Sequence, residues 1–330
     1  MARKSTFILQ RLALMVISLF AVVTIIFLLF RLLPGDPATV LVSPRFSEEQ
    51  RQALLRQHGL TKPLHIQYIA YLENLVQGNL GVSFQHGSPV LPFILNKTLN
   101  TISITLPAVL LAFTIGPFIG AVFAWYRNGP LDKYGTGLVL VAFAAPIFWT
   151  GMIAIMIFSF NLNWLPVGGM RSVTYTETSL AGRFLAWDFL KHAILPVTIF
   201  FLWRLSQPTL IIRNNMIDLL GSPFLKLKQA EGLPERSIIF RHAARNALLP
   251  LIHYSALAVG FAFGGSIILE TVFSWPGVGH AMWNAVLARD YPVAQAAFMM
   301  ISVIIIVLNF VVDIISVYID PRVTQEGVQL

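Results

Sequence analysis

The sequence predicts an all-α, polytopic membrane protein with six transmembrane helices and both termini in the cytoplasm. Of its 330 residues, 56% are hydrophobic and 12% are charged, which is about half the charged fraction of a soluble domain. Uncharged apolar runs of membrane-spanning length recur along the chain. Twelve Lys and Arg residues fall on the segments predicted inside, against four on the outer segments other than residues 34–97. This asymmetry is typical of cytoplasmic loops and sets the orientation.

The first span is predicted over residues 12–30, within an N-terminal helical segment assigned to residues 1–33. Its 19 uncharged residues are enough to cross a hydrocarbon core of about 30 Å. A secretory signal peptide is the alternative, but no small-x-small cleavage site follows the run, so we expect an uncleaved span. Residues 34–97 predict a small extracytoplasmic subdomain, in which helices begin after Ser47 and at Pro63.

The other five spans are assigned to residues 98–320, and residues 321–330 form a cytoplasmic tail. The fourth span is interrupted by Arg204. A cation near the bilayer centre costs about 3 kcal/mol on insertion scales, so it must face protein or water. The fifth span contains Gly260, Gly264 and Gly265, which favour close helix packing over a hinge. The spans are expected within residues 98–126, 134–163, 192–212, 246–269 and 291–318.

The sequence lacks the motifs of an enzyme or a metal site. It has no cysteine, which excludes disulfides and thiolate ligands, and its seven histidines show no i, i+3 or i, i+4 pairing of a metal site. No GxxxxGK[ST], HExxH or GxSxG occurs. We therefore expect a chain that is no enzyme and binds no cofactor or metal. Its net charge of +8 does not indicate nucleic acid, because the cations flank apolar runs.

The loop over residues 214–245 is the most charged stretch of the second half of the chain. Ser222 and Pro223 suit the cap and first residue of a short helix, and Gly232 suits its end. Pro234 opens a second helix that runs into the fifth span. Two interpretations of the short helix remain open from composition: it inserts into a groove on another protein, or it lies on lipid. Its apolar and basic residues are Phe224, Leu225, Lys226, Leu227 and Lys228.

Two motifs of this loop resemble the cytoplasmic coupling motif of ABC importer permeases. They are QAEG at 229–232 and, nine positions after its glycine, RHAARNALLP at 241–250. The chain is identified as a member of the dipeptide/oligopeptide/nickel family, first permease subunit, and the resemblance extends over essentially its whole length. The supporting motifs, in order, are LPGDP at 33–37, NLGVS at 79–83, ETVFSWPGVG at 270–279, RDYPV at 289–293, Asp313, and DPR at 320–322.

The resemblance implies an importer subunit of the bacterial inner membrane. It implies a second, similar permease, two cytoplasmic ATPases that carry ATP and Mg²⁺, and an extracytoplasmic solute-binding protein that delivers substrate. Di- or oligopeptides are the leading substrates, and nickel or a metal chelate is the alternative. A stand-alone membrane receptor or scaffold, with a basic loop that binds lipid, is the competing hypothesis from another class.

The resemblance also implies residue roles. A helix over residues 226–232 would dock into a cleft on an ATPase, braced by residues at the base of the fifth span. Two positions depart from the family pattern: Glu231 replaces a basic or small residue, and Pro234 replaces a serine. The acid would alter the ATPase surface that is complementary. The expected coupling residues are Leu225, Lys226, Lys228, Gln229, Ala230, Glu231, Gly232, Arg241, His242, Arg245 and Asn246.

Four residues are candidates for the pathway or a gate: Arg204, Glu270, Trp275 and Asp313. Arg204 would meet an anionic group in the passage, although a structural contact within the bundle is favoured. Glu270 would serve an outer gate or the binding-protein dock, or else cap a helix at the interface. For Asp313, pairing within the bundle is favoured. Trp275, like Trp164 and Trp187, is an interface aromatic by default.

Overall fold

A computed structural model describes residues 2–32, 62–175, 179–220, 222–244 and 267–319, together with residues 247, 248, 250, 251, 254 and 258. Within these residues the secondary structure is helical, without strands. Four helices are long and apolar enough to span a membrane, and a bent helix pair makes up to five. The polytopic all-α prediction is therefore confirmed in class. The four helices are α1 (Ala2–Leu32), α5 (Val90–Trp125), α9 (Trp187–Leu220) and α15 (Tyr291–Ile319).

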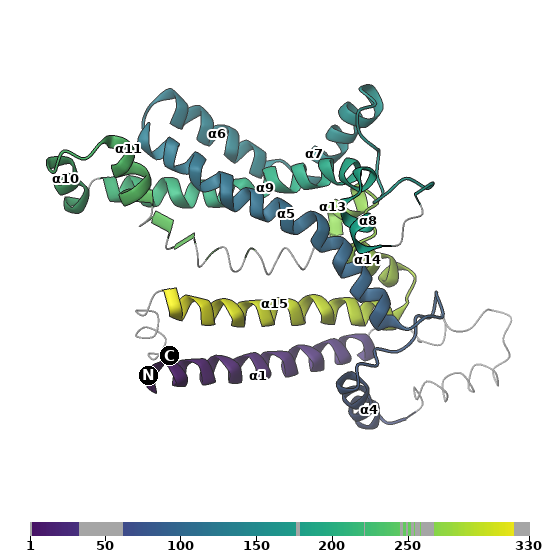
Figure 1. The fold of residues 1–330 in the computed structure, drawn as a ribbon. Helices are drawn as coiled ribbons and strands as arrows, with labels where there is room; N and C mark the ends of the chain where they lie inside the picture. The colour runs from purple at the N-terminus through teal and green to yellow at the C-terminus, as the bar shows by residue number, and fades with distance from the viewer. Residues whose placement is uncertain are drawn as a thin grey trace.

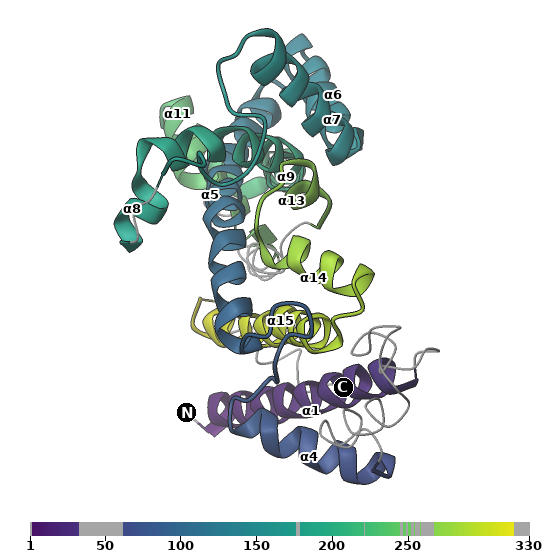
Figure 2. The same ribbon diagram turned by 90° about the vertical axis from the view of Figure 1, so that its right-hand side faces the viewer.

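The long helices lie in two pairs. Helices α5 and α9 pack along each other, and α1 lies beside α15 (Figures 1 and 2). At one end of the α5–α9 pair lie α10 (Pro223–Ala230) and α11 (Glu235–Ser237), which belong to the loop between the fourth and fifth predicted spans. At the other end lie α8 (Leu180–Leu185), α13 (Ile267–Val272) and α14 (Val278–Leu287). The two candidate functional regions thus occupy opposite ends of one helix pair.

The third predicted span is not one continuous helix. Helix α6 (Pro130–Ala144) is followed by α7 (Ile147–Ala154) and the π-helix η1 (Ile155–Asn161), with a bend of 97° between the two halves. The cause is Pro146, because a residue before proline avoids the helical region. Ala145 accordingly has φ −66° and ψ 127°.

Other helix boundaries also differ from the predicted ones. Helix α5 begins at Val90, so the segment expected as an outer subdomain over residues 34–97 ends inside this helix. Helix α9 runs from Trp187 through Arg204 to Leu220 and keeps Pro196 and Pro208 inside it. Of the fifth span, most residues, including the three glycines, lie outside the described residues.

The segment between α1 and α5 contributes α4 (Leu64–Val76), which begins after Pro63 as predicted. The predicted helix after Ser47 lies outside the described residues. Helix α4 is fixed on α1: the Thr24 and Tyr68 hydroxyls are 2.6 Å apart. The Phe27 ring lies 5.1 Å from that of Tyr68 and 5.4 Å from that of Tyr71.

Candidate functional site

The short helix α10 has the start and end that the sequence predicts. Pro223 is its first residue, and Ser222 before it is extended (φ −73°, ψ 148°). The Ser222 side chain makes no capping bond, however, so that part of the prediction is wrong. Past the other end, Gly232 has φ +75°, and its N–H donates to the Gln229 carbonyl at 3.0 Å. The helix therefore covers Pro223–Ala230, and Glu231 and Gly232 form its exit instead of its last turn.

Leu225 holds α10 onto the rest of the protein. Its side chain is 1% exposed, in a cluster with Ile212 and Met216 of α9 and with Ile238 of η2 (Ile238–Ala243). A residue so buried cannot be part of an exposed docking face, although it fixes the position of that face. On the opposite side Phe224 is 42% and Leu227 is 59% exposed. These two residues, which the predicted coupling set omits, make the exposed apolar part of the helix.

The charges of α10 are unevenly compensated. Lys228 donates to both carboxylate oxygens of Glu231, at 2.8 and 3.0 Å. The unusual acid before Gly232 is therefore neutralised locally by a lysine one turn earlier. Lys226 is exposed, like Gln229 and Ala230. The exposed side of the helix is thus apolar and weakly cationic.

The residues expected to brace the helix are only partly described. Pro234 precedes α11 as predicted, and the chain continues into η2, where Ile238, Ile239 and Ala243 are buried against α9 and α10. Arg241 and His242 lie on η2, but their side chains are outside the described residues, as are Arg245 and Asn246 entirely.

An ion pair that the sequence did not predict braces the C-terminal end of α9. The Arg213 guanidinium donates to both oxygens of Asp132, at 2.5 and 2.7 Å. Asp132 is 4% exposed and also accepts bonds from the Asn128 N–H and the Thr136 hydroxyl. A bidentate Arg–carboxylate pair fixes both orientation and distance. The signal in the sequence was a single acid in a turn that carries Arg127 and Lys133.

Glu270 lies on α13 and is fully buried beside the start of α14. One of its oxygens accepts a bond of 2.7 Å from the Thr101 hydroxyl, and the other accepts a bond of 2.7 Å from the His280 N–H. Thr101 in turn accepts from the Val278 N–H at 2.9 Å. Despite these donors, burial raises the pKa of Glu270 to about 7. Of the roles weighed for Glu270, helix capping fits this geometry, because an acceptor at a helix N-terminus satisfies free N–H groups.

The glycine in the sequence WPGVG makes room for this carboxylate. A Cβ on Gly277 would lie 2.4 Å from Glu270 Cδ and 2.5 Å from the Thr101 hydroxyl oxygen. Gly277 has φ −86° and ψ −178°, a conformation open to any residue. Glycine is therefore required because the Glu270 carboxylate and the Thr101 hydroxyl leave no room for a Cβ. The backbone conformation itself does not require it.

Trp275 is not an interface aromatic, because it is 0% exposed. Its Nε1–H donates to the Asn100 carbonyl at 2.8 Å, and its ring meets Phe189 edge-on at 5.7 Å. Asn100 also donates to the Pro276 carbonyl and accepts from Arg183 of α8. The loop between α13 and α14 is thereby tied to α5, α8 and α9. Trp164 and Trp187, each 67% exposed, fit the interface assignment.

A second buried acid joins two of the motifs found in the sequence. Asp290, 1% exposed, accepts a 2.5 Å bond from the Ser83 hydroxyl and bonds from the N–H groups of Phe84 and Gln85. Ser83 ends the NLGVS motif and Asp290 lies in RDYPV. The polar loop after α4 is therefore anchored directly to the chain between α14 and α15.

Comparison with known proteins identifies the chain. The sequence model of the family "binding-protein-dependent transport system inner membrane component" matches residues 116–325. The sequence model of the N-terminal region of the same family matches residues 4–105. This chain belongs to that family. It is an ABC importer permease, a multi-pass protein of the inner membrane, and a transport subunit and not an ATPase.

Several relatives match over nearly their whole length. The chain is 36% identical to a di/tripeptide transport system permease of Pseudomonas aeruginosa, covering 97% of this chain and 99% of that one. It is 32% identical to an oligopeptide transport system permease of Bacillus subtilis, with the same coverage. It is 34% identical to a glutathione transport system permease of Salmonella paratyphi A, covering 96% and 98%.

A solved structure supports the fold. An inward-facing conformation of the MetNI methionine ABC transporter aligns with a TM-score of 0.51 and 12% identity, over 71% of this chain and 95% of that one. At this identity the likeness concerns the fold alone.

Asp313 and Arg204, two candidate pathway residues of the permease, differ in the partners of their charged groups. Asp313 pairs with Arg11 of α1 at 3.2 Å, which is the pairing within the bundle that the sequence favours. Arg204 has no ion pair in the described part of the chain. Its guanidinium lies over the rings of Trp203, at 4.9 Å, and Phe200, at 5.3 Å, and it interacts with the Tyr254 phenol.

Proposed function

We propose that this permease forms, with a second homologous permease, the pathway by which di- or oligopeptides enter the cell. An extracytoplasmic solute-binding protein delivers the peptide, and two cytoplasmic ATPases bind ATP and Mg²⁺ and drive transport. The permease itself binds no cofactor. In this arrangement it has six spans and cytoplasmic termini, an outer subdomain over residues 34–97, a core over residues 98–320 and a short cytoplasmic tail.

The observation that carries the proposal is the construction of α10. The helix is attached to α9 through buried Leu225, while Leu227 on its other side is 59% exposed. An exposed apolar side chain on a short, fixed helix suits insertion into a groove on another protein. Because Leu225 packs against Ile212 and Met216 of α9, a displacement of α10 by an ATPase would be passed to that helix.

Peptide is the proposed cargo because relatives that match along nearly the whole chain are named as transporters of di- and tripeptides, oligopeptides and glutathione. Nickel stays the alternative cargo, with no observation in its favour. The coupling set comprises Lys226, Lys228, Gln229, Ala230, Glu231 and Gly232, with Leu225 as its internal anchor and Arg241, His242, Arg245 and Asn246 at the base of the fifth span.

Arg204 is the proposed pathway residue. It lies in the middle of α9 without a compensating acid in the described part of the chain, and a membrane-embedded cation of this kind is commonly functional. A peptide carboxylate is the anion that it would meet. Glu270 and Trp275 are proposed to hold the outer loop closed, and Asp313 to pair with Arg11.

The decisive experiment replaces the exposed leucine. In the Leu227→Asp variant, a charge faces the groove that should receive an apolar side chain, so we expect ATPase subunits to stop co-purifying and peptide uptake into proteoliposomes to fall at least tenfold. Val76→Asp is the matched control, because Val76 is 88% exposed on α4 at the outer side and should leave uptake unchanged. Normal ATPase binding and uptake by Leu227→Asp would refute the docking role and favour a stand-alone receptor or scaffold.

A further inference from the structure

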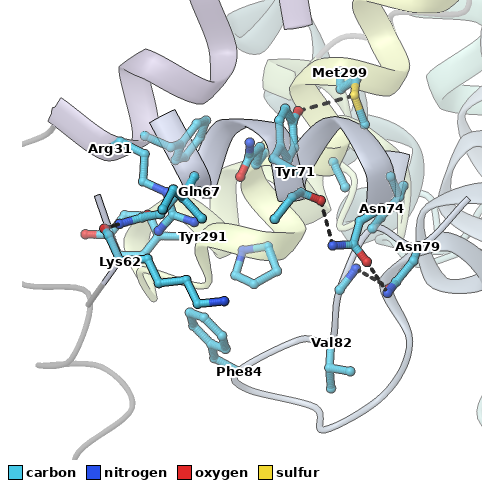
Figure 3. A pocket seen from close by; sticks show the side chains of 18 residues that line it. Arg31, Lys62, Gln67, Tyr71, Asn74, Asn79, Val82, Phe84, Tyr291 and Met299 are labelled. Atoms are coloured by element: carbon cyan, nitrogen blue, oxygen red, sulfur yellow. Dashed lines mark hydrogen bonds between the residues drawn. The ribbon is translucent and has the colours of Figure 1, made fainter. Parts of the chain in front are cut away.

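A cavity of 460 Å³, with both apolar and polar groups in its wall, lies between the end of α1, helix α4 and the start of α15 (Figure 3). Of the described residues that line it, two are cations, Arg31 and Lys62, and none is an acid. Amide and phenol groups complete the polar wall, among them those of Gln67, Asn74 and Tyr291. None of its described lining residues belongs to α10 or to α13, the helices that carry Leu227 and Glu270.

The two cations are uncompensated within the part of the chain that the structure describes. The Arg31 guanidinium lies over the Phe27 ring at 5.6 Å and makes no ion pair there, and the Lys62 ammonium makes none either. A concave site with two positive charges favours an anion. The guanidinium matches a phosphate best, because it can donate two parallel hydrogen bonds.

The cavity lies where a membrane surface is expected. Arg31 follows the uncharged run of the first span directly, and Tyr291 is the first residue of α15. One turn before Arg31, Leu28 and Leu29 are 37% and 51% exposed, as side chains that contact lipid tails would be. Tyrosines and cations at this level are typical of the head-group region.

The wall of the cavity is a built structure. Helix α4 is held on α1 by the Thr24–Tyr68 hydroxyl contact of 2.6 Å. Asn74 donates to the Ala70 carbonyl at 2.7 Å, and Asn79 donates to Asn74 at 2.8 Å. On the α15 side, the Tyr71 hydroxyl lies 3.6 Å from Met299 Sδ. The polar groups are thus held in place before any ligand binds.

We propose that this cavity binds the head group of an acidic phospholipid of the outer leaflet, such as phosphatidylglycerol. The phosphodiester lies between Arg31 and Lys62, and the acyl chains follow the exposed apolar side of α1. Lipid is the expected source of the phosphate, because the cations adjoin an apolar helix face. Basic pockets between membrane helices recognise anionic head groups in this way.

The test uses the full-length chain in nanodiscs of phosphatidylcholine with a minor fraction of phosphatidylglycerol. Lipids retained on the protein are counted by native mass spectrometry, and its melting temperature is measured with and without the acidic lipid. The wild type should retain phosphatidylglycerol selectively and melt several degrees higher in its presence. The variant with Arg31→Gln and Lys62→Gln should lose that selectivity at least fivefold, whereas Arg31→Lys with Lys62→Arg should keep most of it.

Lys191→Gln is the matched control, since Lys191 is an exposed outer cation that lies over the Trp187 ring away from the cavity. It should retain the acidic lipid like the wild type. Equal retention by the double glutamine variant would overturn the proposal. So would full protection by inorganic phosphate in pure phosphatidylcholine discs, which would make a free anion the ligand. If the double variant does not fold, Ala70→Leu narrows the cavity without a change of charge, and unchanged lipid retention by it would overturn the proposal equally.

Discussion

Glu270 and Thr101 are joined by a hydrogen bond of 2.7 Å although 169 positions separate them in the chain. The bond ties α13, which carries Glu270, to α5, which carries Thr101. Because the same carboxylate accepts the His280 N–H, it also fixes the start of α14. One buried acid therefore determines how three helices meet at the outer end of the permease.

The titration of Glu270 predicts that stability depends on pH. Its pKa is raised from 4.5 to about 7 by burial, so the folded state binds a proton more tightly than the unfolded state. The contribution of Glu270 to the free energy of unfolding is therefore fully present below about pH 4.5 and is lost as the pH rises through about 7. The loss approaches about 3 kcal/mol, since each pKa unit corresponds to about 1.4 kcal/mol. The melting temperature in detergent should therefore be lower at pH 8 than at pH 5.

Glu270→Gln supplies the test of that assignment. The amide resembles the protonated acid in size and charge, so the variant should lose most of the fall in melting temperature between pH 5 and pH 8. Glu231→Gln, which changes an exposed acid, should keep the wild-type fall. An identical pH dependence in wild type and Glu270→Gln would mean that another group titrates.

Gly277→Ala should destabilise the permease through a single methyl group. The added Cβ would lie 2.4 Å from Glu270 Cδ, and the surrounding groups are buried and hydrogen-bonded, so the carboxylate must shift. We expect a loss of at least about 2 kcal/mol, as is typical of overpacking in a close-packed site. Gly137→Ala in α6 is the control, because its Cβ would meet nothing within 4 Å and alanine favours a helix. Melting temperatures of Gly277→Ala and Gly137→Ala that agree within a degree would show that the methyl group at position 277 does not overpack the site.

Asp132→Asn should weaken the attachment of the C-terminal end of α9. The asparagine amide would offer one acceptor oxygen to Arg213. In the wild type, two Arg213 donors are both bonded to Asp132. Leaving a partly buried guanidinium half-satisfied should cost about 2 kcal/mol. Asp218→Asn, at an exposed position of α9 without a described partner, should leave the melting temperature unchanged. Equal melting temperatures for the two variants would show that the pair is not stabilising.

The sequence predicts the local features of this protein better than its long-range contacts. The start of α10 at Pro223 and its exit at Gly232 follow from residues within a few positions, and both are confirmed. The sharp bend at Pro146 was missed because proline is tolerated in many membrane helices. The pairs Glu270–Thr101, Asp290–Ser83 and Asp132–Arg213 were missed because their partners meet only after the helices have packed.

The exit from α10 gives the prediction that bears most directly on coupling. Gly232 has φ +75°, and a Cβ there would meet nothing within 4 Å, so a substitution acts through backbone strain alone. Valine resists this conformation at a cost of about 1–2 kcal/mol, whereas asparagine tolerates it. In Gly232→Val, the chain should leave α10 in another direction and lose the bond of 3.4 Å from the Leu233 N–H to the Lys228 carbonyl. Because the site is exposed, the variant should insert normally and melt near the wild-type temperature, yet hydrolyse ATP without peptide uptake in reconstituted vesicles. Gly232→Asn should couple normally, and normal uptake by Gly232→Val would show that the joint lies elsewhere in the loop.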